Sequence, residues 1–349
     1  MKVFLASAIP ERQTTFVPWV EILAGRDRFR THSLTDDPDE ADIILFLDGN
    51  SYNYDFSLKA IRRHPLTIKH RRKTFLYDER DQTWCAMPGL YVSMTKGSFN
   101  PQRQRAVSYV SMMNEFVLME EYRHRQPDLL FSFLGRRVDR TREAILALSH
   151  PRGLVEDTSN FDVFKDSEGG NDGKRRYAEI LGRSKFVLCP KGAGPASFRL
   201  FETMAIGRVP VIISDDWVAP TGPDWGKFAL RIAERDVLHV AAIIEANEIR
   251  FEEMARTARA AWEEWFSPEV LFHRMIENCR EIMANRLVPE GFRFPLLDSR
   301  FLYLWARSAK WKLHETVTRA LRPSVQRTKA EEPSNAAEQM KGHNERYAK

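Results

Sequence analysis

The sequence predicts an α/β protein built from two doubly wound parallel sheets. Three observations favour this fold class: a length of 349 residues, short segments of nearly continuous apolar character, and their alternation with helix-compatible stretches. Domains commonly hold about 100–200 residues, so this length suggests two globular units. Nearly continuous apolar runs are typical of parallel strands covered on both faces, whereas half-exposed strands alternate apolar and polar residues.

The first half of the chain alternates expected strands and helices. In order, these are strand 2–8, helix 18–23, strand 41–47, helix 56–63 and strand 73–77. A further strand at 129–134 is ended by Gly135 and followed by a helix at 140–149. The glycine-rich polar stretch 166–174 is expected to be a surface loop.

The region after this loop is the most regular part of the chain. Its expected elements are helix 175–183, strand 186–189, loop 190–196, helix 197–206, strands 209–214 and 228–232, and helices 235–246, 249–266 and 268–286. This βαβα order argues for doubly wound sheets. The expected divisions are an N-terminal unit 1–125, a C-terminal unit 126–286, a helical segment 287–322, and a disordered tail 323–349 with few large apolar residues.

Composition excludes several classes of protein. The 43% hydrophobic content rules out a wholly disordered chain, and no run approaches the ~20 apolar residues of a membrane helix. Three scattered cysteines fit neither a disulfide framework nor a zinc cluster, which favours a reducing, cytoplasmic location. His273 and Cys279 are interpreted as packing residues, because no His or Cys group has the spacing of zinc ligands.

The positive charge is concentrated near the C-terminus. Between Arg300 and Arg322 there are six basic residues and one acidic residue, an excess equal to the +5 net charge of the whole chain. The rest of the chain is therefore neutral, and we expect no nucleic-acid partner. Two interpretations of 300–322 stay open: a basic amphipathic helix on an anionic membrane surface, or a helix that packs its aromatic residues onto the protein.

The stretch 184–214 carries the strongest functional signal. A buried strand is followed by a loop with two glycines, and Ser197 is placed to cap the next helix. Free backbone N–H groups and the helix dipole make such a junction an anion site. Arg199 lies in the first turn and shares a face with Glu202, so together they fit a nucleoside diphosphate and its ribose. The structural alternative is a simple cap and a solvated ion pair.

These motifs resemble the exostosin family, glycosyltransferase family 47. The segments that carry the resemblance are Ser197-x-Arg199-x-x-Glu202, Gly207-x-x-Pro210-Val211, Asp224-Trp225-x-x-Phe228, Phe133-Leu134-Gly135-Arg136 with Arg142, and the N-terminal run Tyr77–Trp84 with Pro88–Ser93. The resemblance covers residues 75–240, and the N-terminal run is similar to that of bacterial exostosin-like proteins. It implies a GT-B fold, with two Rossmann-like units facing across a cleft.

The resemblance also implies a reaction and a set of site residues. A sugar would be transferred with inversion from a UDP-sugar to a saccharide or lipid-linked saccharide acceptor in bacterial glycan assembly, without a bound metal or other cofactor. The unit 126–286 would hold the nucleotide sugar, and 1–125 would serve the acceptor. Arg199 would hold the diphosphate, Glu202 the ribose, and Ser197 would lie by the phosphates.

Other residues would complete the catalytic machinery. Arg136 and Lys191 are candidates for stabilising the leaving diphosphate, because developing negative charge there favours cationic partners. The acceptor hydroxyl requires a general base. Asp78 and Asp81, after the strand 73–77, are the preferred candidates, with Asp48 as an alternative. Two other functions stay open: a fucosyltransferase of GT-B fold that uses GDP-fucose, and a non-catalytic module that binds nucleotides or glycans.

Overall fold

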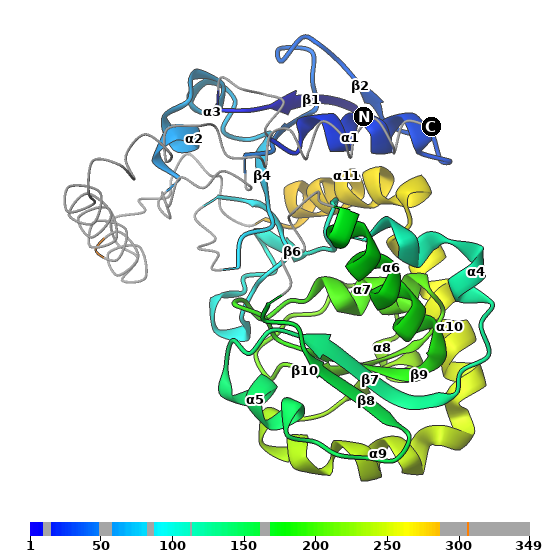
Figure 1. Cartoon of the computed structure of the whole chain (residues 1–349). Coiled ribbons are helices and arrows are strands. Elements are labelled where there is room, and N and C mark those ends of the chain that lie inside the picture. The colour runs from blue at the N-terminus through cyan, green and yellow to red at the C-terminus, as the bar shows by residue number, and fades with distance from the viewer. Residues whose placement is uncertain are drawn as a thin grey trace, which may run out of the picture. The chain divides into compact units, whose positions relative to one another are not determined.

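The structure is a computed structural model that describes residues 1–9, 15–48, 58–81, 87–111, 114–160, 168–286 and 306. The chain divides into two compact units (Figure 1). The first contains Met1–Tyr91, Ser98–Arg105 and the chain from Phe272 onward. The second contains Val92–Gly97 and Ala106–Leu271. This grouping changes units at Ala106 rather than at residue 125, and the assignment of functional domains to 1–125 and 126–286 stays a prediction.

The first unit is built on a six-stranded sheet of order β2-β1-β3-β4-β5-β6. The strands are β1 (Lys2–Ala6), β2 (Ser33–Leu34), β3 (Ile43–Phe46), β4 (Thr74–Asp78), β5 (Gly89–Tyr91) and β6 (Gln104–Ala106). The pairs β1–β2, β1–β3, β3–β4 and β4–β5 are parallel. All four residues of β3 are buried, as expected of a strand covered on both faces.

The helices of the first unit follow its strands. They are α1 (Val17–Arg26), α2 (Lys59–Arg63), α3 (Pro65–Lys69) and most of α11 (Pro268–Asn285). Helix α1 begins with a proline in its first turn, where the missing N–H costs no hydrogen bond. It buries Val17, Trp19, Val20 and Leu23, spaced as one face of a helix.

The second unit is built on a five-stranded sheet of order β11-β10-β9-β7-β8, in which the strand pairs are parallel. The strands are β7 (Leu129–Gly135), β8 (Gly153–Asp157), β9 (Ser184–Pro190), β10 (Val209–Ile213) and β11 (Leu230–Arg231). The chain passes from β7 outward to β8 and then returns to the other side of β7. The order therefore reverses between β7 and β9.

Helices cover both faces of this second sheet. They are α4 (Glu120–Arg123), α5 (Arg140–Leu146), α6 (Glu168–Arg183), α7 (Phe198–Ala205), α8 (Trp225–Phe228), α9 (Val240–Asn247) and α10 (Phe251–Trp265). In Figure 1, α6 and α7 lie on one side of β7, β9 and β10, whereas α5 and α9 lie on the other. The core includes Phe131, Phe186, Val209 and Ile244, all inaccessible to solvent. This two-sided cover is the doubly wound arrangement.

The structure confirms the predicted fold class of two Rossmann-like parallel-sheet units. One expected element is wrong: the stretch 166–174, predicted as a loop, is helical from Glu168 onward as the start of α6. The later part of α6 buries Ala178, Ile180 and Leu181. Packing of that face stabilises the helix and lets it extend into residues of poor helix propensity.

Two expectations fall on the C-terminal part of the chain. The basic aromatic segment 287–322 and the tail 323–349 lie outside the described residues, apart from position 306. In the part of the chain that is described, no helix has both the length and the apolar character needed to cross a bilayer.

Candidate functional site

The second sheet brings the predicted site residues to one edge. Loops after β7 and β9 leave the carboxyl ends of these adjacent strands, where the strand order reverses. Open α/β sheets bind ligands in the crevice at such a switch point. Arg136 follows β7, Lys191 follows β9, and Ser197 precedes α7. The structure therefore places Arg136, Lys191 and Ser197 at one sheet edge, and their roles in binding stay predictions.

Helix α7 begins at the switch point, ends at Ala205 and is followed by Gly207. Ser197 occupies the N-cap position with extended backbone, but its side chain accepts no capping hydrogen bond from the described first turn. The expectation that Ser197 caps α7 through its side chain is therefore wrong. The first-turn amides, left without this acceptor, are suited to an anion. Gly207 follows the helix with φ of +73°, a left-handed conformation that favours glycine and leads into β10.

Arg199 lies against the end of β7. Its Nη2 donates to the carbonyl oxygen of Leu134, and its Cζ lies 4.9 Å from the centroid of the Phe133 ring. Its Nε is buried and has no hydrogen-bond partner among the described residues. An unpaired buried N–H on a cation costs free energy unless an acceptor reaches it. This guanidinium is therefore held in place with a donor still unused.

Glu202 is buried on α7 and is linked to Arg199 through Tyr177. The Tyr177 hydroxyl donates to Oε2 of Glu202 at 2.8 Å, and the Tyr177 ring lies 5.9 Å from Cζ of Arg199. Burial raises the pKa of Glu202, although the Tyr177 hydrogen bond and the Arg199 charge act in the opposite direction. Burial also raises the pKa of Tyr177 well above its usual value, which keeps the phenol a donor.

A small cavity lies beside Glu202. It measures about 20 Å³ and is lined by Ser108, Tyr109, Ser111, Phe198, Phe201, Glu202, Trp262 and Phe266. The rings of Tyr109 and Phe198 stack with centroids 3.7 Å apart and an angle of 25° between their planes. A space of this size holds about one water molecule, so a ribose requires the aromatic wall to move.

Lys191 is held by a carboxylate at the same edge. Its Nζ forms an ion pair with Glu234, and Glu234 also accepts from the Thr141 hydroxyl at 3.1 Å and from the amide of Asp215 at 3.2 Å. Burial acts to lower the pKa of Lys191, but the hydrogen bond and charge of Glu234 outweigh it and raise the pKa. Lys191 is therefore cationic, with part of its charge balanced.

Two further arginines follow β7. Arg136 is exposed, and its carbonyl oxygen accepts from Nη1 of Arg142 at 3.4 Å. Arg142 is buried, and its Nε donates to the carbonyl oxygen of Lys191 at 2.8 Å. Its amide is capped by Asp139 at 2.8 Å. Arg142 thus ties the loop after β7 to the loop after β9, whereas Arg136 is free to meet solvent through its exposed side chain.

The predicted base candidates lie in the first unit, at the carboxyl end of β4. Asp78 is inaccessible to solvent, and both of its oxygens accept from Arg80, at 2.6 Å from Nη2 and 3.0 Å from Nε. Asp81 is exposed. The two carboxylates therefore differ in environment: Asp78 is buried against Arg80, whereas Asp81 is exposed to solvent.

Asp48 occupies the switch point of the first sheet, between β1 and β3. It is 6% exposed, accepts from the Ser7 hydroxyl, and accepts from the amide of Ala8 at 2.7 Å. Burial raises the pKa of Asp48, whereas these hydrogen bonds act to lower it. The carboxylate of Asp48 therefore lies where an α/β sheet binds ligands, and its pKa is raised above the ordinary Asp value.

Sequence reasoning missed Tyr177, Tyr109 and Phe198. Tyr177 comes from α6 and Tyr109 from a segment well before β7, so no short spacing joins them to α7. Trp225, from the motif Asp224-Trp225-x-x-Phe228, donates from Nε1 to the carbonyl oxygen of Pro220 at 2.9 Å and packs edge-on against Trp217. These contacts anchor its loop.

Comparison with known proteins adds an independent finding. Residues 62–247, more than half of the chain, match the sequence model of the Exostosin GT47 domain. The exostosin-1 homolog of Caenorhabditis elegans is 31% identical over 155 residues, which are 40% of this chain and 41% of that protein. A probable glucuronosyltransferase of Oryza sativa subsp. japonica is 36% identical over 100 residues, 28% of this chain and 23% of that protein.

A third relative and a solved structure are also similar to this chain. A probable glucuronoxylan glucuronosyltransferase of Arabidopsis thaliana is 44% identical over 71 residues, 20% of this chain and 16% of that protein. The chain thus spans about two-fifths or less of the length of these relatives. The structure of HepE from Anabaena in complex with UDP has 10% identity and a TM-score of 0.43, covering 80% of this chain and all of that one.

Proposed function

The chain belongs to the exostosin GT47 family, and from this premise we propose that it is an inverting glycosyltransferase that moves a sugar from a UDP-sugar onto a saccharide acceptor. The donor's diphosphate would bind at the edge between β7 and β9. The observation that carries this proposal is Arg199, a half-buried cation whose buried Nε has no hydrogen-bond partner among the described residues. A diphosphate oxygen is the kind of acceptor that satisfies such a donor.

The nucleoside half of the donor fits the groups behind Arg199. Glu202 would accept a hydrogen bond from a ribose hydroxyl through the oxygen that Tyr177 does not occupy. The base would then lie along the aromatic wall of Tyr109 and Phe198, since flat heteroaromatic rings stack on aromatic side chains. The rice and Arabidopsis relatives carry names of glucuronosyltransferases, so UDP-glucuronic acid is the first donor to test.

Inversion requires one displacement at the anomeric carbon. The acceptor oxygen forms a bond to that carbon as the bond to the β-phosphate oxygen breaks, and UDP leaves with the electron pair. Arg199, Lys191, Arg136 and the first-turn amides of α7 would stabilise the charge that develops on the diphosphate. Ser197 would lie beside the phosphates. No resident metal or other cofactor is proposed for this step.

The proton of the acceptor hydroxyl must pass to a base. Asp78 and Asp81 stay predicted candidates, but the geometry favours Asp48, because Asp78 would first have to leave Arg80. A raised pKa makes Asp48 the better proton acceptor near neutrality. We expect Asp48→Asn to lower kcat by about 100-fold or more. Asp78→Asn is expected to lower the free energy of unfolding and to leave kcat of the folded protein nearly unchanged. If folded Asp78→Asn loses as much kcat as we expect of Asp48→Asn, the base is Asp78 instead.

The proposed reaction is tested by nucleotide release. The full chain is incubated with matched UDP- and GDP-sugars, with and without oligosaccharide acceptors, and free nucleotide is measured. We expect release of UDP from one or more UDP-sugars, stimulated by acceptor, and none from GDP-fucose. Release of GDP alone would support a fucosyltransferase. If the protein binds UDP but releases no nucleotide from any donor, a non-catalytic module would be supported.

The place of the reaction is a proposal from sequence alone. Scattered cysteines support a cytoplasmic location, and the basic segment 300–322 supports contact with an anionic membrane that carries a lipid-linked acceptor in bacterial glycan assembly. This segment lies outside the described residues, apart from position 306. Flotation with anionic liposomes compares the full chain with the chain ended after Arg286. Equal flotation of the two folded proteins would rule out the membrane role of 300–322.

A further inference from the structure

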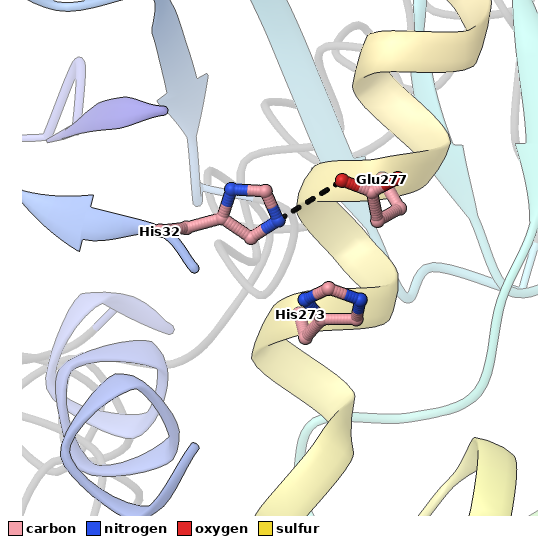
Figure 2. Close-up of side chains that lie close together, drawn as sticks. All are labelled: His32, His273 and Glu277. Carbon is pink, nitrogen blue, oxygen red and sulfur yellow. Dashed lines mark ion pairs between the residues drawn. The ribbon is translucent and has the colours of Figure 1, made fainter. Parts of the chain in front are cut away.

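Three potential ligands meet in the first unit, and one of them is His273, which the sequence analysis interpreted as a packing residue. His32 precedes β2, whereas His273 and Glu277 lie one turn apart on α11. One ligand atom from each lies within 4.8 Å of the others, the one group of three His, Cys, Asp or Glu side chains found so close in the described part of the chain. Figure 2 shows the His32 side chain directed from the segment before β2 toward the helix that carries the other two.

The contacts hold these side chains in place. Nε2 of His32 lies 3.1 Å from Oε1 of Glu277, and the rings of His32 and His273 stack with centroids 5.0 Å apart. The Thr31 hydroxyl lies 2.9 Å from Nδ1 of His273, and the Phe29 ring stacks on His273. Arg280 binds Oε2 of Glu277 from its Nε at 3.0 Å, which leaves Oε1 directed at His32. Metal ligands are commonly oriented by such outer contacts.

Two buried polar side-chain atoms of this unit have no hydrogen bond of acceptable geometry in the described structure. The His32 side chain is 4% exposed, and its Nε2 has no hydrogen bond of acceptable geometry among the described residues, despite the short distance to Glu277. Asp27 is 3% exposed, and its Oδ2 is likewise without a partner in the described structure. Its negative charge acts on both imidazoles. Buried groups left in this way point to a bound species that supplies the missing contact.

We propose that His32, His273 and Glu277 bind one divalent transition-metal ion of the zinc type. Two imidazole nitrogens and a carboxylate oxygen are a ligand set that zinc accepts, and Asp27 would add negative charge beside them. Zinc ligands at about 2.0–2.1 Å in a tetrahedron lie roughly 3.3 Å apart. The 3.1 Å between His32 and Glu277 is close to this spacing.

The metal would connect distant parts of the chain. His32 and His273 are 241 residues apart in sequence, and both belong to the first unit. A bound ion would fix α11 to the segment before β2, the short strand at the edge of the first sheet. Its role would be structural, because binding to the folded state alone stabilises that state by mass action.

The site is tested with Zn²⁺ alone on the full chain, after removal of bound metal with a chelator. Calorimetric titration is expected to show one site that raises the thermal midpoint of unfolding. Glu277→Gln, which keeps the shape of the side chain, and His273→Ala are each expected to weaken binding at least tenfold and to abolish that thermal shift.

A matched control distinguishes Zn²⁺ binding at this site from Zn²⁺ binding to any histidine beside a carboxylate. His150 faces Glu245 at the same 3.1 Å but belongs to no such group of three. His150→Ala is expected to bind Zn²⁺ as the unaltered chain does. The proposal is overturned if the unaltered chain binds no Zn²⁺, or if folded Glu277→Gln and His273→Ala bind it with unchanged affinity. Circular dichroism establishes that each variant is folded.

Discussion

At the scale of single residues, the proposed ribose contact Glu202 carries a cost in stability. Its carboxylate is buried on α7, and one hydrogen bond from Tyr177 satisfies one of its two oxygens. Burying a charge with incomplete pairing is unfavourable, and the raised pKa expresses this. Such a residue is typical of a binding site, where a group is held ready for a ligand at the expense of the free protein.

The pH dependence of stability tests this view of Glu202. A carboxyl whose pKa is raised by folding contributes stability that is complete below the ordinary Glu value near 4.3 and is lost as the pH rises through the folded pKa. We therefore expect Glu202→Gln to gain stability relative to the unaltered chain between about pH 4 and pH 7. Urea unfolding at both pH values measures the difference.

Glu248 provides a control of opposite sign. Hydrogen bonds from Arg152 and then Lys185 lower its pKa to about 2. Its contribution is present above the ordinary Glu pKa and is lost as the pH falls toward 2, so Glu248→Gln should be the less stable protein at pH 7. If Glu202→Gln and Glu248→Gln change stability with pH in the same direction, the assignment of a buried, underpaired Glu202 fails.

Candidate site residues were predictable from sequence only where they lie close together in one short segment. Arg199 and Glu202 followed from helical spacing next to a glycine loop. Tyr177, which pairs with Glu202, was not predictable because α6 brings it from 25 residues away. The His273–Glu277 spacing of four was visible on an expected helix, but His32 completes the group only through the fold. Burial of Asp78 against Arg80 likewise required the structure.

At the scale of elements, the buried strands of four or more residues were the predictable ones, whereas the three-residue strands β5 and β6 were missed although they are buried. Strands β3, β4, β7, β9 and β10 are apolar runs with almost every residue buried, and each was expected from sequence. Strand β8 was missed because its residues are half-buried or exposed at the sheet edge. Strand β2 has two exposed residues, and its pairing depends on β1 rather than on its own composition.

Strand β5 illustrates a backbone requirement that sequence patterns do not show. Gly89 pairs with Leu76 of β4, and a Cβ placed on it would lie 2.1 Å from the carbonyl oxygen of Leu76. We expect Gly89→Ala to lower the free energy of unfolding by more than about 2 kcal/mol, since the backbone of β4 must shift. Urea unfolding followed by circular dichroism measures this loss.

Gly25 in α1 of the same unit is the matched control. No atom lies within 4 Å of a Cβ placed there. Because alanine favours helix more than glycine does, Gly25→Ala is expected to stabilise the protein by about 0.5–1 kcal/mol. A neutral result for Gly89→Ala would contradict the close approach of β4 and β5.

At the scale of the whole molecule, the two units repeat one topology. Each sheet reverses its strand order once, between β1 and β3 in the first unit and between β7 and β9 in the second. Alternating strand and helix signals predicted two such sheets, because sequential parallel strands require crossover helices. The return of the chain to the first unit at Phe272, within α11, was not predictable, because no composition change marks it.

The same topology assigns different chemistry to each switch point. The reversal in the second sheet presents Arg199, Lys191 and Arg136, whereas the reversal in the first presents the carboxylate of Asp48. Cations suit a diphosphate, and a carboxylate of raised pKa suits proton abstraction. The proposed division of roles thus rests on residue type at equivalent positions of two similar folds.

The most direct measurement is the affinity of the full chain for UDP, by calorimetric titration of the unaltered protein, Arg199→Ala and Arg137→Ala. Arg137 is the exposed neighbour of Arg136 and pairs with Asp157 at 3.5 Å. We predict that Arg199→Ala weakens UDP binding at least tenfold while remaining folded, and that Arg137→Ala binds UDP normally. Unchanged UDP affinity in a folded Arg199→Ala variant would contradict the proposed donor site.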